Sequence, residues 1–371
     1  MNEKPYQLIC GDALEQVKRL ESASIDCCIS SPPYWNLRNY NFDGQWGLEP
    51  TFNEYLEKLW SLMDEVWRVL KPTGTAWINL GDTYGTQSGA MRDGKFGAKN
   101  TNNQAFIQPK SIHKSLLLIP HRFAIGCSER GWILRNDIIW SKRNAMPESV
   151  TDRFSKKHEY FFFMAKQAKY YFDLNAVRCE SIKPPKPFNS EYQNPYSQAI
   201  QTGGKTSQNL SYGNPNGKNP GSVSDFWDIP TRPSSAKHYA TFNTELIDKP
   251  IKAGCPEFVC KACGKPREKI IERANFERTR QVGIGQDSEH GTKGRAGNAV
   301  SEIKGLTDCG CNAGFEGGVI LDPFCGTSTT GVRALQLDRK FIGIDGSKEY
   351  IELAEQRLSE TAGRQPLFAT A

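Results

Sequence analysis

The sequence predicts an α/β fold built on a mostly parallel, doubly wound sheet. Short apolar strands alternate with amphipathic helices at both ends of the chain, which is the rhythm of strand–helix–strand units. Two of these strands end in polar turn residues, at the sheet edge where such folds bind ligands. With 371 residues, of which 38% are hydrophobic, the chain is long enough for a large core and two or three domains or subdomains.

The first half of the chain supplies most of the expected strands. Residues 6–10 and 25–30 are short apolar runs bounded by polar residues. Residues 52–70 carry apolar side chains at helical spacing and end at Lys71-Pro72, a helix-stop signal. The remaining elements expected here are helices at 13–20 and 115–130 and strands at 75–80, 132–141 and 159–165, the last pairing with a strand at 170–173.

The last part of the chain repeats the same rhythm. After a helix at 240–251, the expected order is strand 319–321, helix 329–337, strand 341–344 and helix 349–360. Three stretches interrupt the pattern: a polar Gly/Asn-rich loop at 85–110, a Pro/Asn/Ser/Gly-rich segment at 181–224, and a cysteine-bearing insert at 255–311. We therefore predict one half of the main domain at 1–180, an insert at 181–235 and the other half at 236–371.

The composition and the charge distribution of the chain limit the classes of protein to which it can belong. No apolar run is long enough to span a bilayer, and the first residues lack the apolar core of a signal peptide, so a cytoplasmic protein without a membrane partner is expected. The eleven cysteines are scattered and are mostly expected to be free thiols. Residues 110–186 hold 15 Lys/Arg and 7 Asp/Glu, a local +8, whereas the rest of the chain holds 32 and 34, or −2. A basic middle suggests a polyanion partner, although it is often only a solvated face.

The segment Ser31-Pro32-Pro33-Tyr34 follows the strand at 25–30 directly. The two prolines fix their φ near about −65° and contribute no N–H donors, which leaves carbonyl oxygens, a hydroxyl and an aromatic ring at a strand end. Such a corner suits a planar substrate with an amino group, whose hydrogens these oxygens accept. A Pro-Pro pair after a strand is also common loop punctuation, so the corner alone does not define a site.

A second motif lies between the strand at 319–321 and the helix at 329–337. Its turn of small residues runs from Asp322 to Gly331, and Asp345 ends the next strand about twenty residues later. A small-residue turn lets the backbone approach a ligand, and the acid accepts ribose hydroxyls. The turn has neither the three glycines of a dinucleotide fingerprint nor the lysine of a P-loop. It therefore favours a nucleoside ligand without a pyrophosphate over NAD or ATP.

Together these residues resemble the DNA amino-methyltransferases that use S-adenosylmethionine. Ser31–Tyr34 matches the catalytic motif [DNS]-P-P-[YFW], and Asp322–Thr330 matches the cofactor motif D-P-F-x-G-x-G-T-T, except that Ser328 replaces its last glycine. The catalytic motif comes first, which resembles the circularly permuted beta class. Further matching blocks are Gly11-Asp12, Val69-Leu70-Lys71-Pro72-Thr73-Gly74, Asn136–Lys142 with Pro147–Ser149, and His238–Phe242.

The resemblance implies a Rossmann-like methyltransferase sheet, the cofactor S-adenosylmethionine, double-stranded DNA as substrate and a place in restriction–modification systems; a homodimer is left open. It implies methyl transfer to an exocyclic amine of a flipped base, with Ser31, Pro32, Pro33 and Tyr34 as catalytic residues. The implied cofactor-binding residues are Asp12, His238, Thr241, Phe242, Asp322, Phe324, Gly326, Thr327, Ser328, Thr329 and Asp345.

The target base is less clearly indicated than the reaction. Serine at the first motif position favours cytosine N4 over adenine N6, the alternative within the family. Cytosine C5 is disfavoured because it requires a Pro-Cys nucleophile, and no cysteine here directly follows a proline. A non-catalytic DNA-binding module and an RNA or protein amino-methyltransferase are weaker alternatives, since the motif, Asp12 and Asp345 are intact and the permuted order with a large insert fits DNA.

Two further groups of residues are candidate sites. Cys260 and Cys263 resemble one knuckle of a zinc ribbon, and Cys309 and Cys311 are expected to complete a structural Zn²⁺ site, with free thiols as the alternative. Target recognition is expected in the insert at 181–235, with the loop at 85–110 closing over DNA; disorder is the competing interpretation of both. Candidate phosphate contacts are Lys142, Arg143, Arg153, Lys156 and Lys157.

Overall fold

The computed structural model describes residues 4–40, 42–85, 113–177, 225–231, 243–273 and 301–363. The strands are β1 (Tyr6–Cys10), β2 (Ile25–Ser30), β3 (Leu70–Leu80), β4 (Ile133–Ser141), β5 (His158–Ala165), β6 (Phe226–Asp228), β7 (Val259–Cys260), β8 (Lys269–Arg273), β9 (Ser301–Leu306), β10 (Phe315–Glu316), β11 (Val319–Asp322) and β12 (Lys340–Asp345). The helices are α1 (Ala13–Lys18), α2 (Phe52–Val69), α3 (Ile119–Glu129), α4 (Thr244–Gly254), α5 (Thr329–Gln336) and α6 (Lys348–Gly363), with a 3-10 turn at Asn175–Val177. None of these helices is both long and apolar enough to cross a membrane.

Within the described residues, one large sheet has the strand order β1-β12-β11-β2-β3-β5-β4-β6. All neighbouring pairs are parallel except those of β5, which runs antiparallel to both β3 and β4. The chain leaves β2 towards β3 and leaves β11 towards β12, so the topological switch point lies between β11 and β2. The predicted doubly wound α/β fold is confirmed, and the two sequence motifs follow these two neighbouring strands.

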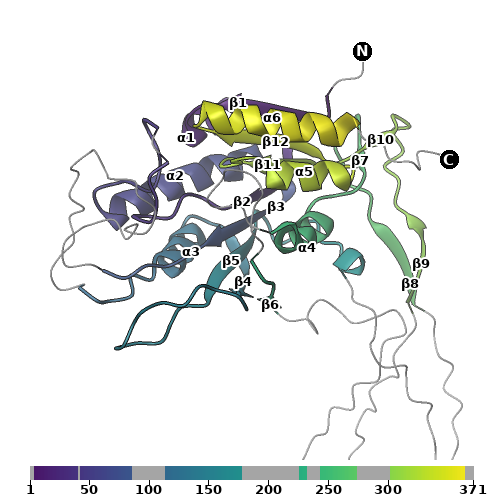
Figure 1. Cartoon of the computed structure of the whole chain (residues 1–371). Coiled ribbons are helices and arrows are strands. Elements are labelled where there is room, and N and C mark those ends of the chain that lie inside the picture. The colour runs from purple at the N-terminus through teal and green to yellow at the C-terminus, as the bar shows by residue number, and fades with distance from the viewer. Residues whose placement is uncertain are drawn as a thin grey trace, which may run out of the picture. The chain divides into compact units, whose positions relative to one another are not determined.

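Helices cover both faces of the sheet, with α1, α2 and α3 on one side and α4, α5 and α6 on the other (Figure 1). Successive side chains of each strand point to opposite faces of the sheet. Cys28, Ala76 and Ile78 pack in the core cluster of the first side, and their chain neighbours Cys27, Ile29 and Trp77 pack in the second. A sheet buried on both faces needs nearly continuous apolar strands, and β2 accordingly carries the apolar run Cys27-Cys28-Ile29.

The V-L-K-P-x-G block has a structural role between α2 and the sheet. The Lys71 amino group donates to both carboxylate oxygens of Asp26, at 2.9 and 2.8 Å, and the N–H of Val319 donates to the same carboxylate at 2.8 Å. Asp26 is only 3% exposed. Burial raises the pKa of Asp26, although Lys71 and the Val319 N–H oppose that rise. The pair therefore ties β2, β3 and β11 together at the switch point.

Some predicted elements need correction. Residues 170–173 do not form a strand with β5, because the N–H of Tyr171 donates to Thr73 and that of Asp173 to Ala253. Helix α3 begins at Ile119 rather than near 115, with Pro120 in its first turn. Strand β3 begins at Leu70, and its register with β2 shifts between Ile25 and Cys27.

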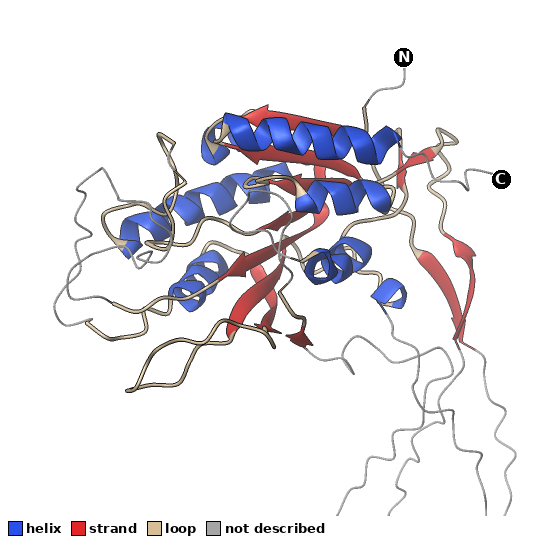
Figure 2. Cartoon of the chain, viewed as in Figure 1, coloured by secondary structure: helices blue, strands red, loops and turns tan. Residues whose placement is uncertain are grey.

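The chain divides into two compact units. The first comprises Met1–Ala176, Ser224–Arg267 and Asp308–Ala371 and holds the large sheet (Figure 2). The second comprises Val177–Val223 and Glu268–Thr307, of which the structure describes chiefly the antiparallel pair β8 and β9. Most of the predicted insert at 181–235 and nearly all of the loop at 85–110 lie outside the described residues.

Candidate active site

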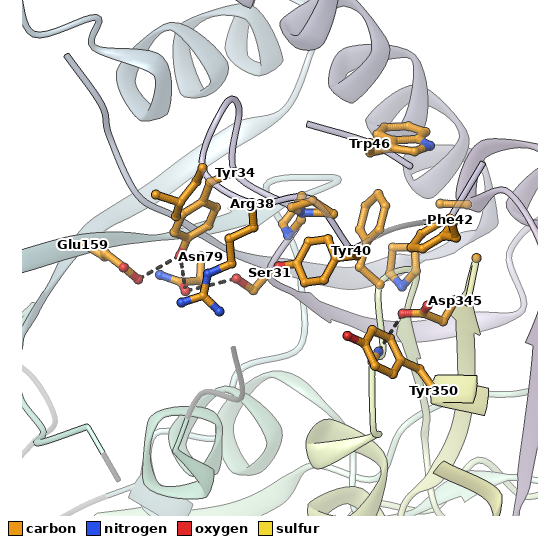
Figure 3. Close-up of a pocket in the computed structure, with 18 of the residues that line it drawn as sticks. Ser31, Tyr34, Arg38, Tyr40, Phe42, Trp46, Asn79, Glu159, Asp345 and Tyr350 are labelled. Carbon is orange, nitrogen blue, oxygen red and sulfur yellow. Dashed lines mark hydrogen bonds between the residues drawn. The ribbon is translucent and has the colours of Figure 1, made fainter. Parts of the chain in front are cut away.

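A cavity of about 610 Å³ opens in the first unit at the carboxyl ends of the central strands. Its walls come from the segments that follow β1, β2, β11 and β12, and from residues of β3, β4 and β5. Figure 3 shows Ser31, Tyr34, Asn79 and Glu159 at one end and Asp345, Phe42 and Tyr350 at the other. The volume is in the range of pockets that enclose a small organic ligand.

The Ser31-Pro32-Pro33-Tyr34 corner forms the first end of this cavity. The Ser31 hydroxyl donates to Asn79 Oδ1 at 3.2 Å, and the Asn79 amide in turn donates to the carbonyl of Tyr160 at 3.0 Å. The Tyr34 hydroxyl lies 2.9 Å from the same Asn79 oxygen and 2.8 Å from Glu159 Oε2 (Figure 3). Asn79, at 1% exposure, is therefore the buried hub of the corner.

Charges behind the corner are paired. The Lys142 amino group donates to Glu159 and lies 4.3 Å from the centre of the Trp140 ring. Burial, with a further contribution from the Glu159 carboxylate, raises the pKa of Tyr34 well above its usual value. Tyr34 therefore keeps its proton at neutral pH and acts as a neutral hydrogen-bonding ring.

Two carboxylates mark the other end of the cavity. Asp345 accepts hydrogen bonds from the N–H groups of Gly326 and Ser347, both at 2.9 Å, which leaves acceptor capacity on each oxygen. Burial raises the pKa of Asp345, and these two N–H groups limit the rise. Asp12 caps α1 by accepting from the N–H of Glu15 at 3.1 Å, and it accepts from the Trp46 indole at 2.8 Å.

Aromatic rings surround the two carboxylates. Trp46 packs edge-on against Phe324 at 5.1 Å between ring centres, and Tyr40 packs edge-on against Tyr350 at 6.4 Å. A Cβ at Gly346 would lie 2.6 Å from the Phe42 ring, so this glycine lets Phe42 close over the backbone after Asp345. Apolar walls with two acids suit a nucleoside, whose ring stacks and whose hydroxyls donate.

The predicted cofactor turn divides into lining and supporting residues. Phe324 and Gly326 line the cavity, whereas Asp322, Thr327, Ser328 and Thr329 do not and are buried. Asp322 accepts from the Ser30 hydroxyl at 2.7 Å, the Thr330 hydroxyl at 2.8 Å and the Phe324 N–H at 3.1 Å. Burial raises the pKa of Asp322 to about 6, against these three donors.

Ser328 adopts the backbone conformation that glycine prefers, with φ +63° and ψ +46°. It is the residue that departs from the family motif, and its side chain is fully buried. Among the described residues its hydroxyl has no hydrogen-bond partner. The turn therefore keeps a left-handed position here although the residue carries a Cβ. The other predicted cofactor residues His238, Thr241 and Phe242 lie outside the described residues.

The five predicted phosphate contacts differ in exposure. Lys142 lines the cavity beside Glu159, so it does not lie on an open face. Arg153 is held between Glu148 at 2.7 Å and the Tyr84 ring at 4.0 Å, and Lys156 donates to the Asp82 carbonyl. Arg143 and Lys157 are exposed, although Arg143 contacts Asp228 at 2.6 Å. All five lie in the segment that joins β4 to β5.

The four predicted metal ligands come together in the first unit. The sulfur atoms of Cys260, Cys263, Cys309 and Cys311 all lie within 4.8 Å of one another. Four thiolates about 2.3 Å from a tetrahedral Zn²⁺ would be about 3.8 Å apart, so the arrangement fits such an ion. Gly264, at φ +66°, forms the knuckle, and its N–H donates to the Cys260 carbonyl at 2.8 Å. The N–H groups of Cys263 and Ala262 lower the pKa of Cys260 to about 6, whereas hydrogen bonds among the thiols raise the pKa values of Cys309 and Cys311.

Several lining residues were missed by the sequence analysis. Asn79 follows the logic of the corner, because it lies near the end of the strand parallel to β2. Glu159 lies near the start of β5 and reaches the same edge only because that strand is reversed. Tyr40, Phe42 and Trp46 belong to an irregular segment after the corner that has no periodic signal.

The switch point, the two acids and the Ser31-Pro32-Pro33-Tyr34 corner are the arrangement expected of a methyltransferase that uses a nucleoside-type cofactor, S-adenosylmethionine. Comparison with known proteins agrees. A sequence model of the family described as DNA methylase, the N6/N4 methyltransferases, matches residues 25–260 and 310–356. M.Cfr9I, a Type II methyltransferase of Citrobacter freundii, is 32% identical over 352 residues, 94% of this chain and 86% of that protein. M.SmaI of Serratia marcescens is 31% identical over 361 residues, 96% and 92% of the two chains.

A solved structure described as PvuII DNA methyltransferase (cytosine-N4-specific) shares the fold. Its TM-score is 0.53, at 15% identity over 98% of this chain and 95% of that chain. The chain belongs to the N6/N4 family of S-adenosylmethionine-dependent DNA amino-methyltransferases.

Proposed function

We propose that this DNA methyltransferase methylates the exocyclic N4 amine of cytosine, with the Ser31 corner as its catalytic end. The hydrogen bond from Ser31 to Asn79 inside the cavity supports Ser31 as the acceptor for an exocyclic amine, and the choice of cytosine rests on the serine at the first position of the motif. Since the Ser31 proton is directed to Asn79 Oδ1, the lone pairs of the hydroxyl remain available to accept an N–H of the target. Asn79 is thus a positioning residue for Ser31.

The second acceptor for the amine is the carbonyl of Pro32. The carbonyl of Pro33 accepts from the Tyr55 hydroxyl at 2.8 Å, and that of Tyr34 accepts from the Leu37 N–H at 3.3 Å. For the Pro32 carbonyl, no partner occurs among the described residues. Two acceptors on the two amine hydrogens let the nitrogen become pyramidal, which reduces the delocalisation of its lone pair into the ring and makes it nucleophilic. Positioning and electrostatics of this kind carry most of the rate.

S-adenosylmethionine supplies, when bound, an electrophilic methyl group on a sulfonium. Asp345 would accept the ribose hydroxyls, and Asp12 would lie near the adenine, among the rings of Phe42, Trp46 and Phe324. This assignment is supported by the free acceptor capacity of Asp345 and by the apolar walls of the cavity. His238, Thr241 and Phe242 remain predicted contacts to the methionine part.

Serine at the first position of the motif favours cytosine N4 over adenine N6. A serine hydroxyl is both donor and acceptor, but its contact with Asn79 commits its proton, so that it meets the amine as an acceptor.

Tyr34 is proposed to stack on the flipped base. The exposed cations Arg143 and Lys157 are proposed to contact DNA phosphates, which would make binding weaken as salt rises.

The four cysteines are proposed to hold a structural Zn²⁺. A closed set of four thiolates leaves no open position for a substrate, so the ion would stabilise the fold and not the reaction. The support is the mutual distance of the four sulfur atoms and the glycine knuckle between two of them.

The reaction is tested by product analysis. Plasmid DNA from a methylation-deficient host is incubated with the protein and labelled S-adenosylmethionine, digested to nucleosides and analysed by mass. We expect N4-methylcytosine, and a loss of about 100-fold or more in rate for Ser31→Ala with unchanged cofactor affinity. N6-methyladenine as the product would overturn the choice of base and leave the corner intact. Normal cofactor binding without any methylated nucleoside would favour a DNA-binding module.

A further inference from the structure

The segment that joins β4 to β5, residues 142–157, is longer than most connections inside a compact domain, and such loops are commonly functional. It extends away from the sheet in Figures 1 and 2. Its first part lines the catalytic cavity through Lys142, Asn144 and Met146. The loop therefore begins at the active site and continues into solvent.

Phe154, on the returning part of this loop, is 97% exposed, more than any other large apolar side chain that the structure describes. A single exposed apolar residue is ordinary, so the exposure of Phe154 matters here only together with the contacts that surround it. By contrast, the side chain of its neighbour Arg153 is only 18% exposed. The loop thus presents the aromatic ring to solvent and turns the guanidinium inward.

Hydrogen bonds hold the Arg153 guanidinium in this inward position. Arg153 donates to Glu148 at 2.7 Å and to the carbonyl of Phe154 itself at 3.0 Å, while its guanidinium lies 4.0 Å from the Tyr84 ring centre. The N–H of Lys156 approaches Glu148 at 3.4 Å, and its amino group donates to Asp82. The backbone on both sides of Phe154 is therefore anchored to the segment that follows β3, close in the chain to Asn79. The anchored backbone therefore holds the Phe154 side chain out in solvent, where it can meet a partner.

The charge around Phe154 suits a polyanion. The loop contains five cations and two acids, a net charge of +3. The two acids are paired, Glu148 with Arg153 and Asp152 with Lys114 at 2.6 Å. The exposed Lys157 is available for a phosphate contact, and the exposed Arg143, which pairs with Asp228 at 2.6 Å, is a second candidate.

We propose that Phe154 is an apolar wedge that enters duplex DNA beside the target base. A base cannot reach the Ser31 corner while it is stacked and paired, and its extrusion leaves a gap in the helix. Phenylalanine is among the side chains that proteins insert between base steps, where it replaces lost stacking. The wedge rests on the DNA substrate of the proposed function but does not depend on which base is methylated.

The test separates duplex opening from methyl transfer. The methylated site is first located by sequencing plasmid DNA modified by the wild type, and two oligonucleotide duplexes carrying that site are made. In one the target base is paired, and in the other it faces an abasic position, which lowers the cost of extrusion. We expect Phe154→Ala to lower kcat/KM on the paired duplex by about 10- to 100-fold, and on the abasic duplex by less than about threefold.

Matched variants keep the result interpretable. Phe154→Trp retains a ring and is expected to stay within about threefold of the wild type on both duplexes. Ser155→Ala changes the adjacent exposed side chain and is expected to have no effect, and all variants should keep the wild-type cofactor affinity and Tm. Equal rates for Phe154→Ala and the wild type, or equal losses on both duplexes, would overturn the wedge. A product other than N4-methylcytosine would change the proposed base and leave this comparison valid.

Discussion

The hydroxyl of Ser30 donates a 2.7 Å hydrogen bond to Asp322, 292 residues later in the chain. Ser30 directly precedes the Ser31-Pro32-Pro33-Tyr34 corner, and Asp322 opens the turn that matches the family's cofactor motif, so the bond joins the two motifs across β2 and β11. The Thr330 hydroxyl completes the contact from α5. Although the two motifs occur in permuted order in the sequence, the sheet therefore brings both to the same switch point.

Asp322 should make stability depend on pH. Burial raises its folded pKa from 3.8 to about 6, so between these values the folded state binds more protons than the unfolded state. The free energy of unfolding then falls as pH rises from about 4 to 6, by up to about 3 kcal/mol from this group. We expect the destabilisation of Asp322→Asn relative to the wild type to shrink by up to that amount between pH 4 and 7. Urea denaturation at several pH values measures it; a difference independent of pH would contradict the assignment.

Breaking the Lys71–Asp26 pair should be costly. Lys71→Met leaves a carboxylate that is 3% exposed with only the Val319 N–H as a partner. We expect a loss of about 3–5 kcal/mol in the free energy of unfolding, measured by urea denaturation. The control is Lys18→Met, which removes an exposed pair with Glu15 and should cost less than about 1 kcal/mol. Similar losses in the two variants would argue against the buried pair.

The sequence predicted those parts of the site that follow from regular strands. Ser31, Tyr34 and Asp345 lie just after or at the ends of β2 and β12, and a strand end in a doubly wound sheet is where ligands bind. The same argument could have predicted Asn79, because this residue lies near the end of β3, which is parallel to β2. The apolar runs at residues 6–10 and 25–30 also predicted these two strands.

Other parts depend on tertiary structure that no local pattern encodes. Glu159 reaches the cavity because β5 runs antiparallel to both of its neighbours, which its phenylalanine-rich sequence does not reveal. Trp46 is held by Asp12 across an irregular segment. Asp322 carries the family motif, yet it supports the turn from behind and does not line the cavity. Motif matching thus identifies the segment but not the role of each residue.

Ser328→Gly should stabilise the protein. A non-glycine residue in the left-handed region costs about 1 kcal/mol, and a buried hydroxyl without a partner costs about 1–3 kcal/mol more. Glycine loses about 0.5–1 kcal/mol through its freer unfolded state. We expect a net gain of about 1–3 kcal/mol by thermal or urea denaturation. Asp338→Gly, at φ +58° but exposed, should gain less, because it removes no buried hydroxyl. A loss of stability in Ser328→Gly would show that its hydroxyl is satisfied.

Removal of zinc should lower the stability of the protein without directly changing the methyl-transfer step. Freshly purified protein is expected to contain one Zn²⁺ per chain by elemental analysis, and Cys263→Ser should lower both the zinc content and Tm. Cys10→Ser is the control, because Cys10 is an exposed thiol outside the cluster. Protein that is free of zinc yet has the wild-type Tm would exclude a structural metal.

Tyr34 should act on the DNA base and not on the cofactor. Its ring packs over Gly81, where a Cβ would lie 2.6 Å from Tyr34, and its hydroxyl is held by Asn79 and Glu159. Stacking of a base on an aromatic ring is worth about 1–3 kcal/mol, so Tyr34→Ala should lower kcat/KM for DNA by about 10- to 100-fold. Tyr34→Phe keeps the ring and loses only hydroxyl contacts, so a decrease of about tenfold or less is expected. Calorimetry should give both variants the cofactor Kd of the wild type, and a comparable loss in cofactor affinity would assign the ring to the cofactor end of the cavity.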